Sequence, residues 1–182
     1  MKKYIIIAFL IIAISLISVF IFIKDSSSVK ENSSYKISVV SAENQYGSIA
    51  KLIGGDRVTV TNIIDNANGD PHTFVSSIQN AKILATADVI IYNGADYDSW
   101  IVPILKSNKN ATIVKVQDLI NIPQSSKFGI NPHLWYNPNT FSSLANKLAD
   151  IFAQKDPKNN TLFKKNLENF NYKYQKVYDL IK

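Results

Sequence analysis

The sequence contains no cysteine and only two histidines among its 182 residues. The lack of cysteine excludes disulfides, thiolate metal sites and cysteine nucleophiles. The net charge of +6 includes Lys2, Lys3 and Lys24, which flank an N-terminal apolar run; without them the 20 basic residues fall to 17, against 14 acidic ones. The remaining lysines are scattered, with no basic stripe interleaved with aromatic residues, so nucleic-acid binding has no support.

Motifs for catalysis are also missing. A metal-dependent hydrolase needs an open metal position and a general base. Neither histidine stands in an H-E-x-x-H arrangement, and the sequence gives no basis for a Ser-His-Asp triad. We therefore expect that the protein is not an enzyme.

The N-terminus carries an uncharged, apolar run of twenty residues, Tyr4–Ile23. This length is enough to span a bilayer, and the lysines before it favour a cytoplasmic N-terminus. No Ala-x-Ala pattern occurs near Lys24, so residues 1–24 are predicted to be an uncleaved membrane anchor, with a signal peptide as the alternative. Either way, the rest of the chain is expected to be exported, in a periplasmic or other extracytoplasmic location. Residues 25–34 are polar and Ser-rich, which is typical of a flexible linker.

Short apolar strands alternate with helical segments over the remaining 150 or so residues, a length typical of one domain. This alternation predicts an α/β fold with a parallel sheet of about four strands wrapped by helices. We expect an α/β lobe over residues 35–157 and a long final helix over residues 158–182. The expected strands are Tyr35–Val40, Arg57–Ile64, Val89–Tyr92 and Thr112–Val116, and the earlier helices are Glu43–Ile53, Ser76–Thr86, Tyr97–Lys106 and Asn137–Gln154.

The two histidines stand in matching contexts, sixty-one residues apart. The first lies in Asp70-Pro71-His72-Thr73-Phe74 and the second in Asn131-Pro132-His133-Leu134-Trp135. Proline fixes its own φ and restricts the residue before it, so each histidine leaves a stiffened loop, which suits a metal ligand. Both motifs follow predicted strands, whose carboxyl ends are the usual ligand-binding edge of a parallel sheet. We therefore predict that His72 and His133 share a metal site; the alternative is two ordinary surface or packing histidines.

These motifs, together with two other stretches, resemble a known family. The stretches are Ser41–Ala50 with Ile53-Gly54-Gly55, and Ala87–Gly94 with Trp100 nearby. The pattern is similar to the zinc/manganese substrate-binding proteins of bacterial ABC importers, solute-binding family nine. The resemblance extends over nearly everything from Tyr35 onward. It implies two α/β lobes joined by one long helix, with the metal held by two histidines of the first lobe and by a His or Glu and an Asp of the second.

The chain departs from this pattern in two ways. Residues 158–182 fit the linking helix, but no second lobe follows, so we expect a natural truncation, a frameshift or a fragment that lacks the third and fourth ligands. Asn131 stands where the family often has Asp, which is expected to alter a contact to the ligand rather than the ligand itself. The loop Pro123–Ile130 lacks the His- and acid-rich insertion of many zinc-specific members, although this does not decide the metal.

Two imidazoles provide about half of a closed site for zinc or manganese. Asp70 is a candidate for orienting His72, or a plain turn residue. Glu43, Asp96 and Asp98 could approach the site, but helix caps or solvated surface groups are the favoured interpretation. Tyr46, Trp100 and Trp135 are expected to be packing residues.

The predicted function is a zinc- or manganese-binding component of an ABC-type uptake system, reduced to its first lobe and working with a membrane permease. A separately encoded second lobe, self-association or water would have to complete the metal site. The alternative is an interaction domain, or a non-functional fragment, that keeps the lobe fold without binding metal.

The anchor hypothesis makes a direct prediction about the mature N-terminus. Because Tyr4–Ile23 is long enough to span a bilayer and lacks a cleavage pattern, the mature protein should retain it and fractionate with membranes. N-terminal sequencing checks this. A mature form starting near Ser26 would contradict the anchor while leaving export intact.

Overall fold

The computed structural model describes residues 35–65, 69–71, 73–120, 122 and 131–180. Residues 35–182 form one unit, distinct from residues 1–34. The predicted anchor and linker therefore lie outside the described residues. Within the described part, no helix is both long and apolar enough to cross a membrane.

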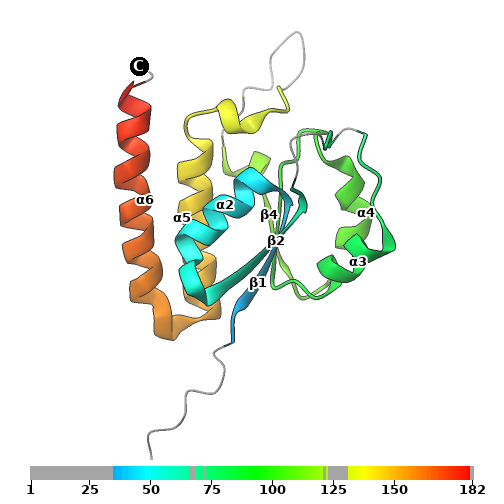
Figure 1. Ribbon diagram of the computed structural model, residues 1–182, viewed down its shortest axis with the longest axis horizontal. Coiled ribbons are helices and arrows are strands. Elements are labelled where there is room, and N and C mark those ends of the chain that lie inside the picture. Colours follow the sequence, from blue (N-terminus) through cyan, green and yellow to red (C-terminus); the bar gives the residue numbers. More distant parts are fainter. Residues whose placement is uncertain (1–34, 66–68, 72, 121, 123–130, 181–182) are drawn as a thin grey trace, which may run out of the picture. The chain divides into compact units, whose positions relative to one another are not determined.

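Strands and helices alternate along the described unit, as the sequence predicts (Figure 1). The strands and α-helices are, in chain order, β1 (Ile37–Glu43), α2 (Asn44–Gly54), β2 (Val58–Ile64), α3 (Ile78–Ala85), β3 (Val89–Tyr92), α4 (Val102–Leu105), β4 (Thr112–Lys115), α5 (Thr140–Lys155) and α6 (Asn160–Leu180).

The four strands form one parallel sheet in the order β2-β1-β3-β4. Val39 of β1 lies opposite Val60 of β2 on one side and Val89 of β3 on the other. The chain moves outward from β1 to β2 and then returns to the opposite side of β1 to form β3. The strand order thus reverses between β1 and β3, and ligands of such sheets bind at the carboxyl ends of the strands beside this point.

Alternating side chains of β1 divide the core in two. Ile37 and Val39 belong to a buried cluster that includes residues of α2, α5 and α6, whereas Val40 and Ala42 belong to a second cluster that includes residues of α3 and α4. Figure 1 shows the corresponding layers, with α2, α5 and α6 on one face of the sheet and α3 and α4 on the other. The two central strands, β1 and β3, are accordingly buried almost throughout, whereas the edge strands β2 and β4 carry exposed positions.

Two predicted helices differ in detail from the observed ones. The helix expected from Asn137-Pro138 begins at Thr140, because Asn137 instead closes a turn: its carbonyl accepts from the Thr140 N–H at 3.0 Å and its Oδ1 from the Asn139 N–H at 2.9 Å. The segment Tyr97–Lys106 contains a 3₁₀ turn and the short α4, with Pro103 in the first turn, where a missing N–H is tolerated.

The final helix, α6, packs against the lobe from Phe163 to Tyr174, whose hydroxyl donates to the Pro138 carbonyl at 2.9 Å. Phe163 is fully buried, with its ring centroid 5.7 Å from that of Phe152. One turn later, the Asn166 side chain donates to the Ile53 carbonyl at 2.9 Å. Farther along, Val177 and Leu180 are 55% and 85% exposed, so the end of α6 contributes little to the core.

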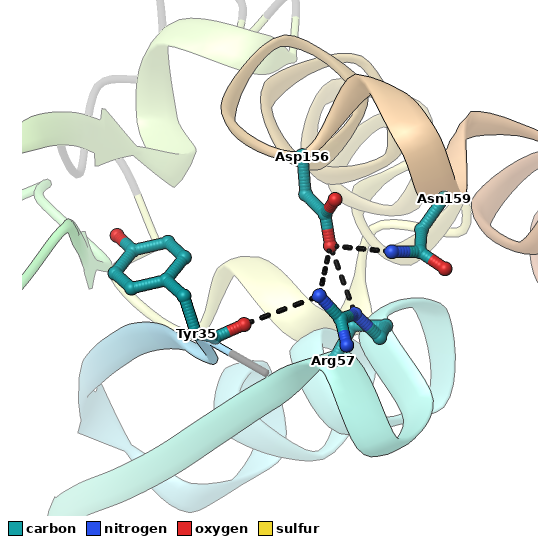
Figure 2. Close-up of polar contacts among 4 residues, drawn as sticks. All are labelled: Tyr35, Arg57, Asp156 and Asn159. Atoms are coloured by element: carbon teal, nitrogen blue, oxygen red, sulfur yellow. Dashed lines mark hydrogen bonds and ion pairs between the residues drawn. The ribbon is translucent and has the colours of Figure 1, made fainter. Parts of the chain in front are cut away.

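A partly buried ion pair joins the start of β2 to the junction of α5 and α6 (Figure 2). The Arg57 guanidinium donates to Asp156 Oδ2 through Nε at 2.9 Å and lies 2.8 Å from it through Nη2. Arg57 also donates to the Tyr35 carbonyl at 3.2 Å, and Asn159 donates to the same Asp156 oxygen at 2.8 Å. This network connects the beginning of the lobe to the start of its last helix.

We predict that Asp156→Ala lowers the free energy of unfolding by about 2–3 kcal/mol, because it leaves a partly buried guanidinium without its carboxylate. Urea unfolding measures the loss. Asp118→Ala is the matched control, since Asp118 is 67% exposed and lies 3.6 Å from Lys115, so that its removal is expected to cost about 0.5 kcal/mol or less. Equal losses in the two variants would contradict a structural role for the Arg57 pair.

Candidate metal site

His133 lies exposed at the carboxyl side of the sheet, directly before a 3₁₀ turn, Leu134–Tyr136. Its ring is surrounded by aromatic rings: the centroids of Tyr97, Trp135 and Tyr136 lie 5.5, 5.1 and 6.4 Å away. Tyr97 and Trp135 also contact each other edge to face, at 5.1 Å. These rings restrict the imidazole from several sides and leave it accessible to solvent, as a ligand for an ion from solution must be.

Asn131 fixes the tautomer of this imidazole. Its Oδ1 accepts from the His133 backbone N–H at 3.0 Å and lies 3.0 Å from His133 Nδ1. Because an amide oxygen can only accept, Nδ1 carries the proton and the free lone pair is on Nε2. A histidine oriented through one nitrogen in this way has the other available for a metal ion. The expectation that Asn131 acts on the histidine rather than as a ligand agrees with this contact.

The loop that carries His133 is tied to the end of β3 by Asn93, which is fully buried. The Asn93 side chain donates to the Pro132 carbonyl at 2.9 Å and to the Gly94 carbonyl at 2.8 Å. Its Oδ1 accepts a short hydrogen bond from the Tyr46 hydroxyl. A central strand therefore sets the position of the residue directly before His133, and Tyr46, predicted to be a packing residue, also has this polar role.

Two carboxyl groups are buried beside this network. Asp98 is 1% exposed, and it accepts from the backbone N–H groups of Asn93 at 2.6 Å and Gly94 at 2.9 Å. Burial raises the pKa of Asp98, while those two N–H donors oppose the shift. Glu43, at the end of β1, is 3% exposed, and its carboxyl interacts with the carboxyl of Asp98. Burial raises the pKa of Glu43 to about 10, and the negative charge of Asp98 adds to the shift.

A pocket of about 380 Å³ opens at this edge of the sheet. It brings Pro71, which precedes His72, close to Trp135, which follows His133. Glu43 also lines this pocket. The lining residues are Glu43, Asn44, Gln45, Ile64, Gly69, Pro71, Tyr97 and Trp135.

His72, Asp70 and Asp96 were the other candidates predicted from the sequence for the metal site. His72 lies outside the described residues, so its place in the site stays a prediction. The Asp70 carbonyl accepts from the Thr73 N–H at 3.2 Å, which closes a turn around the first motif. Asp96 is exposed in a left-handed turn, with φ of 58°. Within the described residues, no three His, Asp or Glu side chains form a group ready to hold a metal ion.

Glu43 and Asp98 were predicted to be helix caps or solvated surface groups. This prediction was wrong, because both residues are buried and neither side chain caps a helix. Glu43 occupies the position before α2 without making a side-chain cap, and Asp98 binds two N–H groups of the preceding loop instead of the turn that follows it. The alternation of the first strand in the sequence does indicate that Glu43 is buried. Extending the first strand by three residues puts Ser41 and Glu43 on the same buried face as Val39.

A parallel α/β lobe with a pocket at its topological switch point is a ligand-binding architecture. The chain matches a family model, zinc-uptake complex component A, periplasmic, over residues 39–182. It belongs to this family, as the resemblance of its motifs predicts, and the family is one of transport proteins.

The relatives carry names from metal transport. The chain is 28% identical to the iron ABC transporter substrate-binding lipoprotein MtsA of Streptococcus pyogenes serotype M1, over 88% of this chain and 56% of the relative. It is 27% identical, with the same coverage, to the manganese ABC transporter substrate-binding lipoprotein PsaA of Streptococcus pneumoniae. The chain thus spans about half the length of the curated relatives it matches.

Solved structures agree on the fold. A Mn-bound periplasmic metal binding protein from Candidatus Liberibacter asiaticus superposes with a TM-score of 0.68 at 26% identity, over 76% of this chain and 53% of the other. The periplasmic zinc binding protein TroA from Treponema pallidum gives a TM-score of 0.71 at 20% identity, over 78% and 52% of the two chains. The α/β prediction with a four-stranded parallel sheet and a long last helix is therefore confirmed.

We predict that Glu43→Gln makes protein stability less dependent on pH. The unfolded chain ionises Glu43 near its ordinary pKa of 4.5, whereas the folded chain keeps the proton to about pH 10. In this window the folded state binds one more proton, so Glu43 lowers stability as the pH rises, and Gln removes that dependence. Between about pH 5 and pH 8 the variant should gain, relative to wild type, on the order of a few kcal/mol in urea unfolding. A constant difference across this range would contradict the burial of a protonated Glu43.

Proposed function

We propose that this protein is an exported metal-binding component of an ABC-type uptake system, which captures a divalent first-row ion and delivers it to a membrane permease. The observation that carries the proposal is His133, held with Nε2 free beside a pocket whose wall includes the residue preceding His72. The names of the relatives support metal as the cargo. On this proposal the protein binds and releases its cargo without chemical turnover, and it is no enzyme.

The proposed ligands are His72 and His133, and the proposed cargo is zinc or manganese. Imidazole nitrogen binds both ions, while a closed site requires about four ligands. Two neutral ligands leave the ion largely hydrated, so binding by this chain alone should be weak. Water, a second copy of the chain or a separately encoded second lobe would complete the coordination. Residues 1–24 are proposed to anchor the protein on the extracytoplasmic side.

An interaction domain without metal is the second candidate, and one observation favours it. A largely apolar groove of about 240 Å³ runs between α2 and α6. Leu52 and Val177, in its wall, are 58% and 55% exposed. An exposed apolar surface of this kind is suited to partner binding or self-association.

A titration of the purified full chain with zinc and with manganese separates the two candidates. We predict weak binding of one ion by the wild-type chain, and at least tenfold weaker binding by a His72→Ala, His133→Ala double variant, because both imidazoles are removed. Binding should also weaken toward about pH 5, since protonated imidazole cannot coordinate. Isothermal titration calorimetry measures both effects.

Thermal unfolding provides the control for the double variant. A bound ion raises the melting temperature of the folded chain by linkage, so zinc or manganese should shift the wild type and leave the double variant unchanged. Equal affinity and equal thermal shifts in the two proteins would eliminate the histidine site and favour the interaction domain. Tight binding by the wild type alone would indicate further ligands within this lobe.

A further inference from the structure

The buried hydroxyl of Tyr46 bonds to the residue that holds the loop of His133. Tyr46 lies in α2, and Tyr46 and Asn93 are both 0% exposed. The hydroxyl donates to Asn93 Oδ1, while Asn93 Nδ2 donates to the carbonyls of Gly94 and Pro132. A continuous series of hydrogen bonds therefore runs from α2, through the end of β3, to the residue directly before His133.

The donors and acceptors of this series determine which way the Asn93 amide faces. A carbonyl oxygen can only accept, so the amide nitrogen must face Gly94 and Pro132, and the amide oxygen is left to accept from Tyr46. Burial raises the pKa of Tyr46, so its hydroxyl keeps the proton that it donates. Without this hydroxyl the buried amide oxygen loses its donor, which is unfavourable and favours a shift of the amide toward water or another donor.

The contact between His133 and Tyr97 reports where the loop lies relative to β3. Tyr97 belongs to the turn after β3, and its ring centroid lies 5.5 Å from that of the imidazole. Trp135 lies 5.1 Å from the imidazole, but it belongs to the same loop as the histidine and moves with it. A displaced loop would therefore separate His133 from Tyr97 and keep it beside Trp135.

We propose that Tyr46 is a positioning residue for the metal ligand His133, acting through Asn93 without contacting the metal ion. Its hydroxyl keeps the amide turned toward Pro132, and that bond keeps the imidazole beside Tyr97 at the edge of the sheet. A ligand that is already in position needs no reordering when the ion arrives, so loss of the hydroxyl lowers metal affinity. The inference rests on the proposed metal site for this effect on affinity, while the placement of the imidazole is measured without metal.

Tyr46→Phe is the informative variant, because it removes one oxygen atom and keeps the ring and its packing in the core. Asn93→Asp is a second variant, since its carboxylate can still accept from Tyr46 but has no hydrogen to donate to Pro132. Tyr174→Phe is the matched control. The Tyr174 hydroxyl also donates to a carbonyl, that of Pro138 at 2.9 Å, but it lies outside the series of bonds that reaches Pro132.

Proton NMR of the metal-free full chain in mild detergent measures the contact between His133 and Tyr97, with a His72→Ala variant used to assign the imidazole signals. We expect a nuclear Overhauser effect between the two rings in the wild type and in Tyr174→Phe. Both variants of the bond series should lose it. In a titration with Zn²⁺, Tyr46→Phe should bind about tenfold more weakly than the wild type, and Tyr174→Phe should bind like the wild type.

The outcomes separate the role of Tyr46 from the metal site itself. An unchanged contact between the rings in Tyr46→Phe would overturn the positioning role, whatever the zinc affinity. Loss of the contact in Tyr174→Phe as well would reduce the effect to general destabilisation and would also overturn it. A lost contact with wild-type zinc affinity would overturn the role of Tyr46 in metal binding. If the wild-type chain binds no zinc, the proposed metal site fails, and the NMR contact still decides whether Tyr46 positions His133.

Discussion

The burial of polar groups where β1 and β3 end is the constraint on which the rest of the lobe depends. Both faces of a parallel sheet are covered, so groups at this edge must find partners within the protein. Asn93 satisfies its own side chain by bonding to Tyr46, Pro132 and Gly94, and these three contacts connect α2, the His133 loop and the turn after β3. The position of the exposed imidazole is therefore set by a fully buried amide.

The electrostatics of this edge are unusual for a structural core. Removing a carboxylate from water costs free energy, and two adjacent acids repel each other when both are charged, so such a pair contributes little to stability. Asp98 has a clear structural task, because it holds the turn that contains Ala95 and Asp96, both in left-handed conformation with φ of 52° and 58°. Glu43 makes no bond to a backbone N–H group, and its carboxyl interacts with that of Asp98 instead.

Much of the fold could be predicted from the sequence because local patterns determine it. Runs such as Val89–Tyr92 match the observed strand in full, and Gly54-Gly55 marks the end of α2 as expected. The site was predicted less completely. Acidic residues usually lie at caps or in solvent, and the burial of Glu43 and Asp98 depends on the pairing of β1 with β3, whose partners such as Val39 and Val89 are fifty positions apart. No local pattern contains that pairing. Likewise, the bond between Asn93 and Pro132 spans 39 positions and becomes visible only in three dimensions.

The uneven packing of α6 has a consequence for how the protein opens. Phe163, Asn166 and Tyr174 hold it to the lobe, whereas Val177 and Leu180 in its last turns are exposed. Helical hydrogen bonds without tertiary support break and re-form far more often than those beneath a core. We therefore expect hydrogen-exchange protection along α6 to fall from the amides near Phe163 to those of the last turn. The last turn of α6 is thus expected to open without unfolding of the core.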